Sequence, residues 1–113
     1  MAEVEISFET AKLAKLCSSE KKLRGKYGPR QSGLIQQRLL DLAAAETLVV
    51  MRFLPGRCHE LKGDFAGHLA LDLVHPDRLV FRPDHEPVPK KDGALIWEAV
   101  TKIEVVGIGD YHN

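Results

Sequence analysis

The chain has 113 residues, of which 44% are hydrophobic and 28% are charged, the proportions of an ordinary globular protein with one core. This composition excludes a mainly disordered, fibrous or membrane protein. Lys and Arg together number 16, as do Asp and Glu, so the formal charge is zero and a nucleic-acid partner would have to meet a local basic patch.

The cysteines and the N-terminal residues indicate the compartment. Cys17 and Cys58 are too few for the disulfide framework of a small secreted domain. Cys58 and His59 point to opposite faces of a strand, so neither a cysteine-protease site nor a zinc site is expected. Residues 1–5 include acids where a signal peptide needs positive charge, and no apolar run approaches the roughly 18 residues of a membrane span. The sequence therefore predicts a cytoplasmic protein without a membrane partner.

The first half of the chain predicts one strand and two helices. Residues 4–8 alternate apolar and polar side chains, which is typical of a strand with one buried face. Residues 9–26 form a basic amphipathic helix, and residues 30–45 place apolar side chains about one helical turn apart. Gly28 and Pro29 interrupt the chain between the two helices, which are expected to pair antiparallel.

The second half predicts mainly strands. Residues 47–53 fit either a short strand or the last turn of a helix connection. Strand-like runs follow, separated by short turns, and a proline-rich polar loop leads to a long final strand. The runs are residues 58–61, 68–74 and 79–81, the loop is 82–95, and the final strand is 96–108. Helices and strands do not alternate, so we predict the α+β class.

Three polar segments could supply a site: Leu-Pro-Gly-Arg-Cys-His-Glu-Leu-Lys-Gly-Asp at residues 54–64, Pro-Asp-Arg-Leu-Val-Phe at 76–81, and Asp-Tyr-His at 110–112. The first two include neighbouring strands of the predicted meander and the last follows the final strand, so we expect them to lie close together. In this order and spacing they resemble the HigB-type toxins of the RelE/ParE superfamily of toxin–antitoxin systems. The resemblance covers about residues 34–113.

The resemblance implies a RelE-like single domain over residues 1–113, in which an N-terminal strand and two antiparallel helices pack on a twisted, mainly antiparallel sheet of four to five strands. It also implies a ribosome-dependent endoribonuclease that cleaves mRNA without a metal or cofactor. A HigA-like helix-turn-helix antitoxin would bind it in a hetero-oligomer. In the reaction of this family, a 2′-hydroxyl attacks the adjacent phosphate, so the site needs a base, an acid and cations.

Residues matching the family's functional positions are His59 and Lys62 on its first active strand, Arg78 at its phosphate-stabilising arginine, and Asp110, Tyr111 and His112 in its C-terminal cluster. The resemblance and the chemistry of the imidazole make His112 the expected proton carrier, as base or as acid, with Asp110 orienting it. Arg78 and Lys62 offer positive charge to a phosphate, and Tyr111 suits stacking on a base.

The first predicted helix carries most of the local positive charge. Residues 12–30 contain seven Lys or Arg and the single acid Glu20. One interpretation is contact with ribosomal RNA phosphates, and the other is a solvated helix face. The residues expected to contact RNA are Lys12, Lys15, Lys22, Arg24 and Lys26.

Two departures from the family favour a different class of function. The chain is neutral, and Leu71 and Asp72 stand near the family's second cationic position. The alternatives are a non-catalytic module that binds an antitoxin and controls an operator, or a ParE-like toxin directed at gyrase. Whether residues 82–95 contact antitoxin or substrate stays open.

Overall fold

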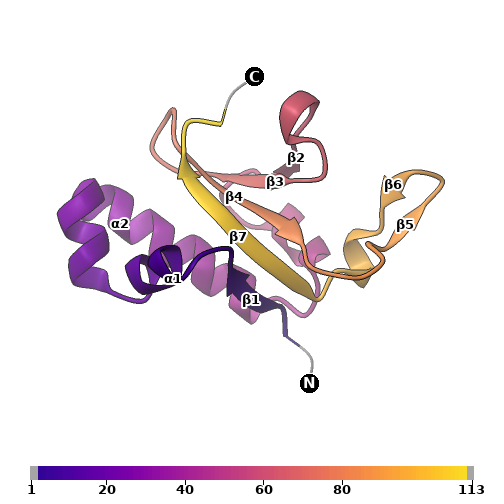
Figure 1. Ribbon diagram of the computed structural model, residues 1–113, viewed down its shortest axis with the longest axis horizontal. Helices are drawn as coiled ribbons and strands as arrows, with labels where there is room; N and C mark the ends of the chain where they lie inside the picture. Colours follow the sequence, from indigo (N-terminus) through magenta and orange to yellow (C-terminus); the bar gives the residue numbers. More distant parts are fainter. Residues whose placement is uncertain (1–2, 112–113) are drawn as a thin grey trace.

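The computed structural model describes residues 3–111. A five-stranded sheet has the order β1-β7-β4-β3-β2, and the helices cover one of its faces (Figure 1). The strands are β1 (Glu5–Phe8), β2 (His59–Glu60), β3 (Leu69–Asp72), β4 (Arg78–Pro83) and β7 (Lys102–Gly109). β1 is parallel to β7 and the other pairs are antiparallel. The predicted α+β class and mainly antiparallel sheet are therefore confirmed.

The helices are α1 (Ala11–Cys17) and α2 (Glu20–Ala44), so the boundary between them lies earlier than predicted. The hydroxyl of Ser19 accepts a hydrogen bond from the Lys22 amide at 3.1 Å and caps the start of α2. At the predicted interruption, α2 instead has a kink, because Gly28 adopts φ 80° and ψ 168° and Pro29 restarts the helical path.

The segment at residues 47–53 is a 3₁₀ helix, Leu48–Phe53, which selects the helical of the two alternatives. The final strand is shorter than predicted, because Trp97–Ala99 forms a further 3₁₀ turn before β7. Trp97 is buried, and its indole N–H donates to a Glu60 carboxylate oxygen at 3.1 Å. This burial holds residues 97–99 out of an extended path.

The proline-rich segment 82–95, predicted as a loop, contains a small hairpin of β5 (Lys90–Lys91) and β6 (Ala94–Leu95). Its turn residues Asp92 and Gly93 have φ values of 54° and 82°. An Asp-Gly pair with positive φ is the preferred two-residue hairpin turn. The hairpin stands out from the five-stranded sheet (Figure 1).

The main core fills the space between α2 and one face of the sheet. Among its fully buried side chains are Leu23 and Ile35 from α2 and Phe81 from β4. A smaller cluster of Leu61, Ala70 and Val80 covers the opposite face, which we call the open face. No helix within residues 3–111 is long and apolar enough to cross a membrane.

A β-bulge changes which residues of β7 reach the open face. Val80 pairs with Gly107, whereas its neighbour Phe81 pairs with Val105, so Val106 is the extra residue. The alternation of β7 is therefore reversed beyond the bulge. Gly107 consequently faces the same side as Val80, and the C-terminal end of β7 is directed at the open face.

Gln31 holds the turn between β3 and β4 against α2, and its loss should weaken the fold. Its side-chain N–H donates to an Asp77 carboxylate oxygen at 2.9 Å, and its carbonyl accepts from the Val74 amide at 2.8 Å. Because Gln31 is only 6% exposed, Gln31→Ala should lower the free energy of unfolding by about 1–3 kcal/mol, as expected for buried polar groups that lose their partner. Urea denaturation measures this change.

Gln37→Ala is the matched control for that measurement. Gln37 lies on the same helix but is exposed, and its amide donates only to Asp41 at 2.9 Å. It should change stability by less than about 0.5 kcal/mol. Equal losses of stability at Gln31 and Gln37 would show that the hydrogen bonds of Gln31 to the β3–β4 turn contribute nothing to the free energy of unfolding.

Candidate functional site

The open face gathers polar residues from three strands into adjacent rows. Asp72 of β3 pairs with Arg78 of β4, which pairs with Gly109 of β7. Residues directly opposite on paired strands share a face, so all three positions lie on the open face. His59 belongs to the neighbouring row, because it pairs with Ala70, two residues before Asp72. The sheet thus brings two of the predicted site residues, His59 and Arg78, to one face.

Arg78 is the most enclosed cation of this face, with a side chain that is 14% exposed. Its Nε lies 3.6 Å from the Asp72 carboxylate. Arg57 holds the same carboxylate through its Nε at 2.8 Å and through a second nitrogen at 3.3 Å. The hydrogen bond and charge of Asp72 raise the pKa of Arg57. The Asp72 carboxylate therefore lies between two guanidinium groups. A phosphate that binds there would have to displace this carboxylate or share the guanidinium groups with it.

Tyr111 folds back over the sheet just after β7. A Cβ atom at Gly107 would overlap its hydroxyl, so the ring occupies the space that a glycine leaves open. The ring meets Phe65 edge to face, with centroids 5.3 Å apart and an interplanar angle of 74°. This pair forms an aromatic wall on the open face next to Val80.

The His59 ring is oriented by a hydrogen bond to a nearby backbone carbonyl group. Its Nδ1 lies 2.7 Å from the carbonyl oxygen of Arg57. Because a carbonyl only accepts hydrogen bonds, Nδ1 carries the proton in the neutral ring and Nε2 is the basic nitrogen. The ring is therefore set to accept a proton at Nε2.

The remaining predicted site residues are less closely placed. Lys62 precedes the 3₁₀ turn Gly63–Phe65, at the Leu69 end of β3, whereas Arg78 pairs with Asp72 at the other end. Three residues of strand, roughly 10 Å, separate these ends. Asp110 is exposed directly after β7. His112 lies outside the described residues.

The expected RNA-contacting side chains separate into two groups. A hollow of about 430 Å³ is lined by Lys12, Lys15, Lys22 and Lys26, and we call it the lysine hollow. Its walls also include Leu13, Leu16 and Val106. Arg24 is not among the lining residues, and its guanidinium pairs with Glu20 on the exposed side of α2 at 3.7 Å.

The sequence did not identify Arg57 as a second cation of the site. The Pro-Gly pair before it signalled a turn, and Arg57 adopts φ 50° there, but only the folded chain shows that it reaches Asp72. Asp72 was noted only as a departure. The alternation of β3 was sufficient to place it on the face of Ala70, because the two are two residues apart.

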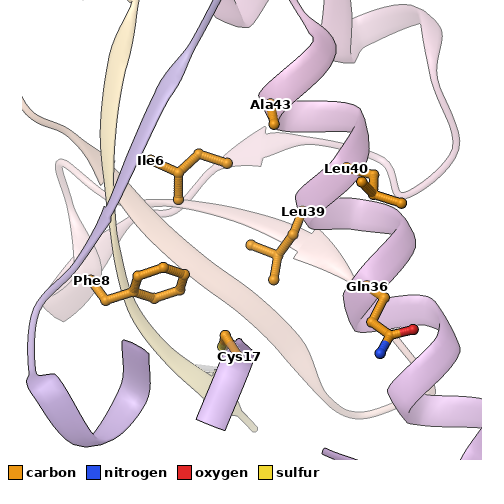
Figure 2. Close-up of a pocket in the computed structure, with 7 residues that line it drawn as sticks. All are labelled: Ile6, Phe8, Cys17, Gln36, Leu39, Leu40 and Ala43. Atoms are coloured by element: carbon orange, nitrogen blue, oxygen red, sulfur yellow. The ribbon is translucent and has the colours of Figure 1, made fainter. Parts of the chain in front are cut away.

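A second hollow, of about 450 Å³, lies between β1 and the helices (Figure 2). Ile6 and Phe8 of β1 face Leu39 of α2 across it. Its lining residues are Ile6, Phe8, Cys17, Gln36, Leu39, Leu40 and Ala43.

Neither cysteine is an activated nucleophile. Burial raises the pKa of the Cys17 thiol to about 11. Burial is also the main cause that raises the pKa of the Cys58 thiol to about 12.

Two solved structures resemble this arrangement over their whole length. A YoeB/ParE toxin from Agrobacterium tumefaciens matches 96% of this chain and 100% of its own, with a TM-score of 0.58 and 14% identity. The chain has the fold of the YoeB/ParE toxins. A YoeB-YefM complex from Staphylococcus aureus matches 99% of this chain and 100% of its own, with a TM-score of 0.55 and 17% identity.

At these identities the shared property is the architecture. No protein-family model and no curated protein matches the sequence. The fold is the one that the resemblance implied, whereas membership of the RelE/ParE superfamily and the HigB subtype stay predictions.

Proposed function

We propose that this chain is the toxin of a toxin–antitoxin pair and cleaves mRNA on the ribosome as an endoribonuclease. The observation that supports the proposal most is the position of Arg78. It is an almost enclosed guanidinium on the open face of a YoeB/ParE-type fold, and His59 and Tyr111 reach the same face. A guanidinium suits a phosphate whose negative charge grows in the transition state.

The proposed reaction needs one base and one acid. The 2′-oxygen gives its proton to the base and bonds to the adjacent phosphorus. The bond from phosphorus to the 5′ oxygen then breaks, and that oxygen takes a proton from the acid. His59 fits the base because Nε2 is its basic nitrogen. The acid is assigned to His112, with Asp110 orienting it.

The cationic and aromatic groups have separate roles in this proposal. Arg78, with Arg57 beside it, stabilises the phosphate, and Lys62 adds positive charge from the β2–β3 connection. Tyr111 stacks on a base of the RNA, as aromatic rings do with unpaired nucleotides. The products are a 2′,3′-cyclic phosphate and a 5′-hydroxyl end.

A protein partner is part of the proposal. One of the similar structures is a YoeB-YefM complex. By analogy, this chain binds an antitoxin, of the HigA-like helix-turn-helix class, and acts in the cytoplasm when the antitoxin is absent.

Inducing the chain without an antitoxin in a bacterial host tests the function. Growth should stop, and transcripts should be cut only where they are translated, with a cyclic phosphate at the new 3′ ends. A transcript without a start codon should stay intact in the same cells. A folded chain that neither slows growth nor cuts translated mRNA would rule out the enzymatic proposal.

One observation favours a second candidate, a non-catalytic module that binds an antitoxin or a gyrase-type target. Asp72 already holds both Arg57 and Arg78, so their charge is partly neutralised. For such a module, Arg78→Ala and His112→Ala should leave the biological effect unchanged. A supercoiling assay would separate a gyrase poison from an operator-control protein.

A further inference from the structure

Three neighbouring hollows on the surface are linked by the residues that they share. The lysine hollow shares Lys26 with a middle hollow of about 400 Å³, which Tyr27 and Arg30 also line. The middle hollow shares His75 and Asp77 with a small hollow of about 80 Å³, which Arg57 and Arg78 line. We call this row of three hollows the cationic track. Its cations are Lys12, Lys15, Lys22, Lys26, Arg30, Arg57 and Arg78.

The local helix caps concentrate charge at one end of the track. The Thr10 hydroxyl caps α1 through the Leu13 amide at 3.1 Å, and Ser19 caps α2. Lys12 and Lys15 follow the cap of α1, and Lys22 and Lys26 follow the cap of α2. The four side chains line the same hollow. Like charges three or four residues apart on a helix destabilise it.

No ion pair in the described part of the chain offsets this repulsion. Within residues 3–111, none of the four lysines forms an ion pair with an acid, and none of the residues lining their hollow is acidic. The acids that line the rest of the track are engaged, Asp77 by Gln31 and Asp72 by the two arginines. The lysine end is therefore complementary to a ligand that carries negative charge.

The track also offers apolar and aromatic surface beside its cations. Leu13, Leu16 and Val106 lie among the lysines. Tyr27 lies at the middle, with the Lys26 ammonium 5.5 Å from its ring centre. Val106 also belongs to the open-face cluster that includes Tyr111, so the lysine end adjoins the aromatic wall. Single-stranded nucleic acid binds surfaces that combine cations, which contact its phosphates, with aromatic side chains, on which its bases stack.

We propose that the cationic track binds the single-stranded RNA that flanks the cleaved phosphate, with the scissile phosphate at Arg78 and flanking phosphates in the lysine hollow. This inference rests on the proposed function, because it takes Arg78 as the place of cleavage. A regular series of phosphates matches cations distributed along the whole track, from α1 to β4. An acidic polypeptide is the competing occupant.

Binding of a fluorescent single-stranded RNA with methylated 2′-hydroxyls tests the track without cleavage. The variant replaces Lys12, Lys15, Lys22 and Lys26 by alanine. Its affinity should fall at least about tenfold, and its salt dependence should become shallower by up to about 3 units, because each phosphate contact in a single strand contributes about 0.7. A dinucleotide should show little of this loss, because it is too short to occupy both ends.

The matched control removes the same charge from other exposed lysines. These are Lys21, Lys90, Lys91 and Lys102, none of which lines the track. The control should bind RNA within about twofold of the wild type. Equal weakening in both variants, or no salt-dependent binding by the wild type, would overturn the track. Stronger binding of an oligoglutamate peptide, lost in the track variant, would assign the surface to an acidic polypeptide and overturn it as well.

The two proposals fail separately. If expression leaves growth and mRNA unaffected but the track variant loses RNA affinity, the track stands and the ribonuclease is wrong. If growth stops through mRNA cleavage while both lysine variants bind RNA equally, the ribonuclease stands and the track is wrong.

Discussion

Replacing Arg78 by alanine is expected to lower the rate of RNA cleavage about 100- to 1000-fold, because removing one donor that stabilises developing charge costs about 2.7–4 kcal/mol of barrier. The side chain is 14% exposed, so water compensates little for its loss. Single-turnover cleavage of a codon on programmed ribosomes measures the effect. Arg78→Lys should recover only part of the rate, because an ammonium lacks the planar fork of donors.

Arg82→Ala is the matched control for Arg78. Arg82 lies four residues further along β4, on the same face, but it pairs with Glu104 and is exposed. Its replacement should change the rate by less than about twofold. Asp72→Asn should instead raise the rate of RNA cleavage, because it removes the negative charge that pairs with Arg57 and Arg78. Equal rates for Arg78→Ala and Arg82→Ala would contradict a catalytic role for Arg78.

Replacing Phe81 by alanine is expected to lower the free energy of unfolding by about 3–5 kcal/mol. Phe81 is fully buried, and its strand neighbours Leu69 and Val105 belong to the same core. Natural domains have a total stability of about 5–15 kcal/mol, so the variant should lose a large share of it. Thermal and urea unfolding followed by circular dichroism measure the loss.

Phe53→Ala makes the same chemical change at an exposed position. Phe53 is 83% exposed at the end of the 3₁₀ helix Leu48–Phe53, so it buries little apolar surface. Its replacement should change stability by less than about 0.5 kcal/mol. If Phe81→Ala cost as little as Phe53→Ala, the core described above would not be the one that stabilises the sheet.

Local patterns were sufficient for much of the fold. The alternation at residues 4–8 predicted β1, and the turn residues between short apolar runs predicted the meander of β2, β3 and β4. These elements were predictable because strand alternation and turn chemistry act over a few residues. The interruption at Gly28 was also located, although it produced a kink within α2 rather than a boundary.

Other elements depended on competition between signals. Ser19 looked like an ordinary helical residue, yet its hydroxyl caps a new helix. The Asp92-Gly93 turn was outweighed by the surrounding prolines, so the hairpin was missed. The bulge at Val106 adds one residue to one strand, and the apolar sequence there gives no local sign of it.

The candidate site was predictable as a set of residue types but not as a set of contacts. Order along the chain indicated that the segments of His59 and Arg78 would lie close together as neighbouring strands, but β3 lies between β2 and β4. Their shared face follows from the register of both strands with β3. The ion pairs of Asp72 with Arg57 and Arg78 join residues that are distant in sequence, and the return of Tyr111 over Gly107 depends on the bulge. Such contacts are set by tertiary packing.

The parallel pairing of β1 with β7 bears on when the molecule becomes complete during its own synthesis. Glu5 pairs with Lys102 and Phe8 with Val105, so the first strand has no partner until the last one has left the ribosome. β4 likewise waits for β7, which carries Gly109 to the side of Arg78. The helices can form early, but a nascent chain lacks the C-terminal wall of the site. Until β7 and Tyr111 have left the ribosome, a growing chain therefore lacks both the strand that lies beside Arg78 and the ring that covers Gly107.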